Sequence, residues 1–384
     1  MSSSKFDFLL VGVKEYLDSK QKYPYPDLLH HGMNTLSLEI KKSVSFPKTM
    51  QGFLKLLEEP VKDYCPPKWI PSEFDGDFGL LDMGSLSEEA NDYIDEYLAE
   101  AISERDKVPE SLATTIEKII EIDNSTFIRL FNELKKAYHN DNPKKAQQEY
   151  LILRPFLIEY KYATGKDIKN TFKRTRYISA EEVGDLYEDC EEGRDYWYCD
   201  RCGILIERDG YLKGLKPRLC GNHHKNLSYV HRVEGQKDLR RVKEGVWRRV
   251  CFPGIPELNL YSALEKLKTE HPDYLKEVRL YPGVDCYDIQ LRFSDDTVWA
   301  INFKDVQYPY RLAQKLEGLY REGSLRYNES FYVISDRCID KYPNYLKILR
   351  EEAKKLPPAT QLSSDRNFRQ RVRDKISELQ KGIS

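Results

Sequence analysis

The chain has 384 residues, which is too long for one ordinary domain and suits two or three. Its 61 Lys and Arg residues nearly balance 63 Asp and Glu residues. This excludes a surface that is basic all over and binds nucleic acid through it, but it does not exclude one local basic face. No apolar run approaches the ~18 residues of a membrane helix, and the N-terminus lacks the pattern of a secretory signal. These features predict a cytoplasmic protein.

Five of the eight cysteines stand alone, and their spacing is not that of a secreted disulfide framework. An intracellular chain keeps such thiols reduced. We therefore expect reduced thiols at Cys65, Cys190, Cys251, Cys286 and Cys338.

Residues 1–175 are predicted to be mostly helical. Residues 6–17 form an amphipathic segment, and apolar residues recur at helical spacing over 87–102 with Ser87 as a fair N-cap. Pro143 at a first-turn position starts a further helix, which we expect Gly165 to end. A helical scaffold or partner-binding domain is the expectation for this region.

The middle of the chain carries a metal-binding pattern. Cys199 and Cys202 are separated by two residues, and Cys220 and His223 repeat that spacing after 17 intervening residues, with His224 as the alternative to His223. Two chelating pairs are what tetrahedral zinc requires, and four protein ligands leave no open position for a substrate water. The pattern predicts a structural zinc ribbon. The alternative is a set of reduced side chains without metal.

The remainder of the chain alternates between helical and strand patterns. Two strands flank a turn at residues 294–296, and the other elements are spaced as in a compact α/β domain with a mixed sheet. The predicted elements are a helix at 259–267, strands at 278–280, 286–293 and 297–303, a helix at 311–319, a strand at 330–335, a helix at 343–355 and a last helix capped by Ser364.

The hairpin places an acid at the start of one strand and a lysine near the end of the next. Asp288 is the first acid, Lys304 is the lysine, and position 302 is where a second acid is expected. Two carboxylates on adjacent strands bind Mg²⁺ or Mn²⁺ through oxygen, and a lysine two residues from the second acid points to the same side of the strand. This order is typical of the restriction-endonuclease-like PD-(D/E)xK nucleases. The alternative is an ordinary hairpin with surface Asp and Lys.

Position 302 departs from that pattern, because it is Asn. An amide oxygen can bind Mg²⁺ but carries no charge, so metal affinity should fall. Three explanations stay open: a weak or inactive nuclease, an inactivating replacement, or substitution by another acid. The further candidate acids are Glu257, Glu265, Asp285 and Asp305, although a carboxylate at the start of a helix also simply favours the helix dipole.

A basic segment lies just before this core. From Arg208 to Arg249 there are twelve basic and four acidic residues. Such a segment can follow a phosphate backbone, or it can be a solvated connector. The candidate nucleic-acid-binding residues are Arg240, Arg241, Lys243, Arg248 and Arg249.

Three runs, at residues 252–258, 287–288 and 297–305, together resemble one family. It is the restriction-endonuclease-like protein encoded beside prokaryotic PIWI-related proteins in three-gene defence islands, and the resemblance covers about residues 240–380. The family usually has Asp where Asn302 stands here. The resemblance implies Asp288 and Lys304 as active-site residues, and a PIWI-related protein and a helicase as partners against invading DNA.

We therefore predict a multidomain α plus α/β protein. It would be a nuclease-fold subunit of a prokaryotic antiviral or anti-plasmid defence system, with metal-dependent phosphodiester hydrolysis weakened or lost because of Asn302. The alternative is a non-catalytic nucleic-acid-binding or assembly subunit of the same kind of complex, and either can be a homo-oligomer. The predicted domains are a helical domain at 1–175, a zinc ribbon at 176–235 and a PD-(D/E)xK nuclease-like domain at 236–384.

Overall fold

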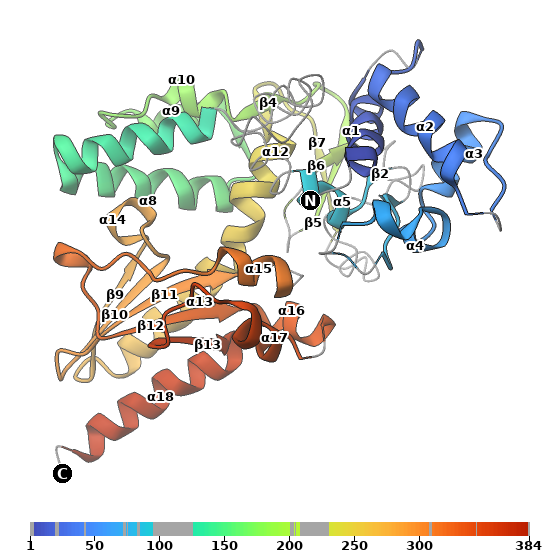
Figure 1. The fold of residues 1–384 in the computed structure, drawn as a ribbon. Coiled ribbons are helices and arrows are strands. Elements are labelled where there is room, and N and C mark those ends of the chain that lie inside the picture. The colour runs from blue at the N-terminus through green and yellow to red at the C-terminus, as the bar shows by residue number, and fades with distance from the viewer. Residues whose placement is uncertain are drawn as a thin grey trace. The chain divides into compact units, whose positions relative to one another are not determined.

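The computed structural model shows a mixed α/β protein with two compact units (Figure 1). The first unit comprises Met1–Ser125 and Asp189–Leu239, and the second comprises Thr126–Glu188 and Arg240–Ser384. This division does not follow the three predicted domain ranges, which stay a prediction. The structure describes residues 4–19, 23–41, 44–71, 74, 76–82, 85–94, 126–199, 203, 205–207, 230–306, 309–342 and 344–382.

Helices predominate in the N-terminal part of the first unit. The close pairing of the first two is enforced at Gly12, where an added Cβ would lie 2.3 Å from the backbone nitrogen of Leu29. Ser87 caps a helix by accepting the N–H of Ala90, as predicted, while residues 95–125 lie outside the described part of the chain. The elements are α1 (Ser4–Asp18), α2 (Asp27–Glu39), α3 (Met50–Leu56), α4 (Val61–Tyr64), η1 (Pro67–Trp69), β1 (Leu81–Asp82), β2 (Ser85–Leu86) and α5 (Glu88–Asp92).

A small antiparallel sheet completes the first unit, with strand order β6-β5-β7. Its strands are β5 (Asp195–Cys199), β6 (Leu205–Glu207) and β7 (Val230–Glu234). Cys199 ends β5, and its carbonyl accepts the N–H of Gly203, which has a φ of 73°. The other predicted zinc ligands, Cys202, Cys220, His223 and His224, lie outside the described residues, so the zinc ribbon stays a prediction.

The second unit begins with helices and a three-stranded sheet of order β3-β8-β4. The prediction of one helix from Pro143 to Gly165 is wrong in its C-terminal part. The helix ends at Glu159, and Gly165 is the first residue of the next helix, because Thr164 and Asp167 form a capping box there. The elements are a helix at 126–140, α8 (Pro143–Glu159), β3 (Tyr162–Thr164), α9 (Gly165–Phe172), α10 (Ala180–Gly184), β4 (Tyr187–Asp189) and β8 (Leu239–Val242).

The C-terminal part of the second unit contains a five-stranded sheet of order β13-β12-β11-β10-β9. Strands β9, β10 and β11 pair antiparallel, and β11, β12 and β13 pair parallel, which confirms the predicted mixed sheet. The strand bounds are β9 (Leu275–Leu280), β10 (Ile289–Phe293), β11 (Val298–Lys304), β12 (Glu329–Ile334) and β13 (Thr360–Ser364). The sequence pattern missed β13, whose residues Thr-Gln-Leu-Ser-Ser lack the apolar alternation of a predicted strand.

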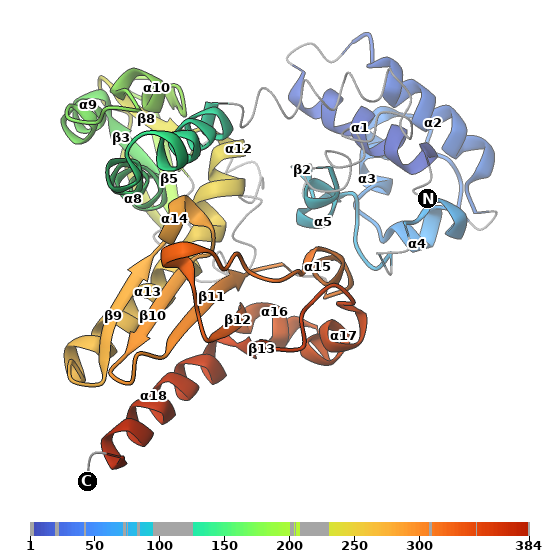
Figure 2. The same cartoon turned by 60° about the vertical axis from the view of Figure 1, so that its left-hand side comes forward.

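Helices cover both faces of this sheet (Figure 2). Trp299 and Phe331 pack against Phe368 of α18 on one face, and Ala300 and Tyr332 belong to the core beneath α15 and α17 on the other. The helical elements are α12 (Glu244–Val246), the π-helical turn η5 (Trp247–Cys251), α13 (Phe252–Glu270), α14 (Pro282–Asp285), α15 (Pro309–Lys315), η6 (Gly323–Leu325), α16 (Asp336–Lys341), α17 (Tyr345–Glu352) and α18 (Asp365–Lys381).

The five isolated cysteines form no disulfide in the described part of the chain. Burial raises the pKa of the Cys65 and Cys251 thiols to about 12, which keeps both protonated near neutral pH. None of the helices within the described ranges is long and apolar enough to cross a membrane.

Candidate active site

The hairpin of β10 and β11 brings the three predicted active-site residues to one end of the sheet. Asp288 directly precedes β10, and its N–H donates to the carbonyl of Ile301 at 3.0 Å. Its carboxylate Oδ2 accepts the backbone N–H of Phe303. Asn302 and Lys304 share one face of β11, since side chains alternate along a strand.

Asp288 is strongly buried, with 7% of its surface exposed. Burial raises the pKa of its carboxyl well above the ordinary value, and the nearby carboxylates of Glu257 and Asp285 raise it further, against the opposing charges of Lys304 and Arg154. The hairpin acid therefore belongs to one group of interacting charges.

The turn before β10 is strained. Tyr281, Gly283, Val284 and Asp285 all have positive φ, at 46°, 70°, 55° and 66°, and a β-branched residue such as valine rarely adopts this region. This turn delays the start of β10 to Ile289, so the predicted strand over 286–293 began too early. Such strain persists only where surrounding contacts impose it, and it concentrates at functional sites.

Two of the four further candidate acids join the group of charges. Glu257 lies in the second turn of α13, which begins at Phe252 rather than at 259, and its Oε2 accepts the hydroxyl of Tyr281 at 2.8 Å. Asp285 is held at the strained turn, where its Oδ2 accepts the hydroxyl of Tyr150 at 2.6 Å. The Glu257 side chain is 7% exposed, and burial raises its pKa. A role limited to the helix dipole does not account for this burial.

The other two candidate acids are engaged elsewhere. Glu265 forms an ion pair with Lys268 of the same helix at 3.0 Å. Asp305 accepts hydrogen bonds from the guanidinium of Arg337 at 3.1 Å and from the thiol of Cys338 at 3.2 Å, both on α16. Neither carboxylate bonds to a residue of the charged group in the described part of the chain.

Sequence reasoning missed Arg154 of α8, which lies among these acids. Its Nη2 donates to both carboxylate oxygens of Glu257 at 3.2 and 3.0 Å, and its Nη1 lies 3.4 Å from Oδ2 of Asp285. The guanidinium also lies over the ring of Tyr281, 4.9 Å from its centroid. No motif marks this residue, which is separated from Glu257 by 103 positions.

Neighbouring side chains stabilise the charged form of Arg154. Burial disfavours the charged form, but Glu257, Tyr150 and Asp285 outweigh it, so the pKa of the guanidinium rises above its ordinary value. With 11% of the side chain exposed, this is a buried ion pair rather than a surface contact.

Nucleases of this fold generally use a divalent metal ion, which would need free oxygen ligands among these residues. The Oδ1 of Asn302 is buried and has no hydrogen-bond partner among the described residues, which would suit a cation. Against this, Arg154 already holds Glu257 and Asp285, and position 302 carries no charge. No group of three or more His, Cys, Asp or Glu within the described ranges is placed to hold a metal. In this arrangement the residues do not fit a divalent ion.

The last part of the basic segment, from Arg240 to Arg249, lies along β8, α12 and the π-helical turn η5. All five of its side chains are partly buried: Arg240, Arg241, Lys243, Arg248 and Arg249. Arg241 pairs with Glu188 at 2.6 Å, and the N–H of Lys243 donates to the carbonyl of Leu186 at 3.0 Å. The segment is therefore packed against its own unit, unlike a solvated connector, and its contact with nucleic acid stays a prediction.

The elements from α13 to α18, with the strained turn and the hairpin, correspond to one known family. Residues 254–380 match the family described as the REase associating with pPIWI_RE. This match confirms the restriction-endonuclease-like resemblance seen in the sequence and places that domain at the C-terminal end of the described fold. It includes Glu257, Asp285, Asp288 and Lys304, whereas Arg154 lies outside it. Comparisons with curated proteins and with solved structures gave no match.

Proposed function

We propose that the chain is the nuclease-fold subunit of a prokaryotic defence system, acting on nucleic acid together with a PIWI-related protein. The observation that carries this proposal is the family match over residues 254–380, whose description names the pPIWI_RE partner. DNA as the target, a helicase as a second partner, self-association and a cytoplasmic location are parts of the same proposal.

Phosphodiester hydrolysis would depend on Asp288, residue 302 and Lys304. Lys304 ends β11, and its Nζ lies 6.0 Å from the centroid of the Tyr332 ring. Its charge also acts on Asp288, and its ammonium would orient a phosphate or a water. Because Asn302 is uncharged, we propose that hydrolysis by this chain is weak or absent.

Cleavage assays test this proposal. Supercoiled plasmid, single-stranded DNA and RNA are incubated with Mg²⁺ or Mn²⁺, with and without the PIWI-related partner. Asn302→Asp is expected to cleave at least about tenfold faster than the unchanged chain, and adding Lys304→Ala should remove the gain. Asn259→Asp, at an exposed position of α13, is the matched control. If Asn302→Asp cleaves no substrate in the complete complex, hydrolysis is not the function.

A non-catalytic subunit is the second candidate, and the ion pairs of Arg154 with Glu257 and Asp285 favour it. In that case the unchanged chain and both variants should bind the nucleic acid equally well and cleave none of it. Filter binding beside the cleavage assay separates the two candidates.

We also propose a structural zinc ion bound by Cys199, Cys202, Cys220 and either His223 or His224. The support is the spacing of the two pairs, together with the hydrogen bond from the N–H of Gly203 to the carbonyl of Cys199. The zinc would stabilise a segment with few large aliphatic side chains.

A further inference from the structure

We propose that Arg154 is the resident cation of the candidate active site, and that a divalent metal ion binds Glu257 and Asp285 only when Arg154 is withdrawn. The inference rests on the proposed function only in taking the Glu257, Asp285 and Asp288 group as the nuclease site. In this proposal α8 controls the charge of that site, although α8 lies outside the family match.

One face of α8 makes this contact. Gln147, Tyr150 and Arg154 are spaced by three and four residues, so their side chains lie on the same side of the helix. The amide of Gln147 donates to the carbonyl of Tyr281 at 2.9 Å and accepts the N–H of Val284 at 2.9 Å. The face therefore holds both ends of the strained turn and both acids.

The guanidinium uses the oxygens that a metal ion would need. It contacts both carboxylate oxygens of Glu257, and the same group reaches Asp285. A divalent ion placed beside these carboxylates would lie next to a fixed positive charge in a buried region, where repulsion is weakly screened. Arginine and metal ion therefore compete for the same two acids.

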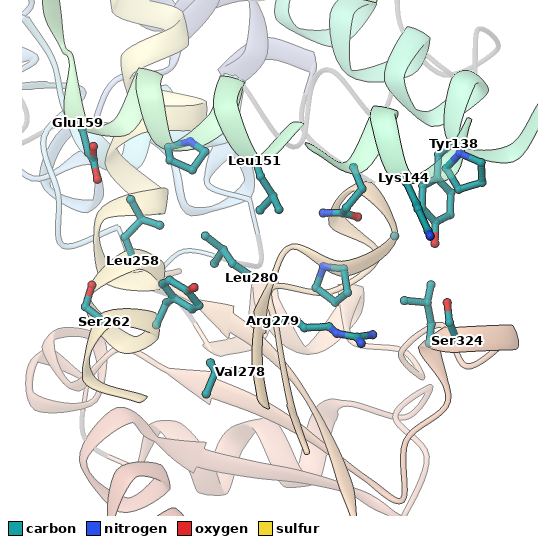
Figure 3. Close-up of a pocket in the computed structure, with 17 residues that line it drawn as sticks. Tyr138, Lys144, Leu151, Glu159, Leu258, Ser262, Val278, Arg279, Leu280 and Ser324 are labelled. Atoms are coloured by element: carbon teal, nitrogen blue, oxygen red, sulfur yellow. The ribbon is translucent and has the colours of Figure 1, made fainter. Parts of the chain in front are cut away.

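A groove borders α8 beside this contact. The groove has a volume of about 850 Å³, with Leu151 and Glu159 of α8 on one side and Leu258 and Val278 on the other (Figure 3), and Pro155 also lines it. Pro155 directly follows Arg154 and cannot donate the backbone hydrogen bond of a regular helix, which makes this the natural place for α8 to bend. Withdrawal of Arg154 would therefore be a bend of α8 at Pro155, next to the groove.

Titration of the full-length protein with Mn²⁺ tests the competition without any nucleic acid. We expect Arg154→Met to bind Mn²⁺ at least about tenfold more tightly than the unchanged chain, and Arg154→Met with Glu257→Gln to lose that gain. Arg129→Met is the matched control, because Arg129 also pairs with two carboxylates, Glu133 and Glu182, but at an exposed position. Equal Mn²⁺ affinity of Arg154→Met and the unchanged chain would overturn the inference.

Thermal unfolding gives a second readout. Arg154→Met leaves two buried acids without a counter-ion and should lower the Tm, and Mn²⁺ should restore it in this variant but not when Glu257→Gln is added. If Arg154→Met does not fold, Arg154→Lys decides. Lysine has one nitrogen in place of the two that reach Glu257 and Asp285, so it cannot hold both acids in the same way. Affinity for Mn²⁺ should therefore rise about threefold or more, and an unchanged affinity would overturn the inference. Failure here leaves the cleavage assays unaffected, because these measurements contain no nucleic acid.

Discussion

Asp288 and Phe303 are joined by a hydrogen bond from the backbone N–H of Phe303 to Oδ2 of Asp288. The bond fixes the hairpin acid against the opposite strand, at a position shielded from solvent. An ionisable side chain buried in this way costs stability when it is charged, because burial removes its hydration, and active sites commonly retain such groups.

Asp288→Asn should therefore stabilise the protein near neutral pH. The folded-state pKa of Asp288 lies above its value of ~3.9 in the unfolded chain, so the unchanged protein loses stability as pH rises from that value towards the folded-state pKa. Asn can still accept the N–H of Phe303 and has no charged form. We expect a gain of about 1 kcal/mol or more in the free energy of unfolding at pH 7, and no gain at pH 4. Urea unfolding at both pH values checks this, and a larger gain at pH 4 would contradict it.

Trp299 is expected to stabilise the fold rather than to act in the site, although it belongs to the family-like run of β11. Its ring is 2% exposed and packs against Phe293 and Phe331, and its Nε1 donates to Glu329 at 3.1 Å. Trp299→Ala should lower the free energy of unfolding by about 3–5 kcal/mol, measured by denaturant unfolding. Tyr320→Ala, at an exposed ring, is the control and should change it by less than about 1 kcal/mol.

Purified protein should contain about one equivalent of zinc, measured by elemental analysis after purification without chelator. Cys220→Ser should lose the metal and lower the Tm, because the zinc supplies folding energy to its segment. Cys286→Ser is the control, since that cysteine lies outside the predicted ribbon. Full zinc content in Cys220→Ser would show that this residue is not a ligand.

Lys243→Gln should weaken nucleic-acid binding if the basic segment follows a phosphate backbone. Loss of one phosphate contact should reduce the slope of log affinity against log salt by about 0.9, with little dependence on nucleic-acid sequence. Lys266→Gln on α13 is the control, because its side chain is exposed and lies outside the segment. Equal slopes for the two variants would remove Lys243 from the interface.

The sequence alone determined the hairpin, the mixed sheet and the family resemblance that the match over residues 254–380 confirms. Alternation of apolar residues on both sides of residues 294–296 predicted the strands β10 and β11, which the structure contains. Ser364 was the predicted cap of the last helix, and in the structure its side chain accepts the N–H of Asn367 at the start of α18. These features depend on neighbours within a few positions, so local periodicity and capping chemistry are enough to indicate them.

Only the tertiary structure decided which charges meet at the site. It brought Arg154 to Glu257 across 103 residues, held Val284 in a left-handed conformation, and directed Glu265 and Asp305 to other partners. Apart from the pairing of Glu265 with Lys268 three residues along the same helix, these outcomes have no local pattern. The position of a buried charge depends on packing between distant segments and on the free-energy cost of leaving the charge unpaired. Both depend on contacts that form only when the segments have come together.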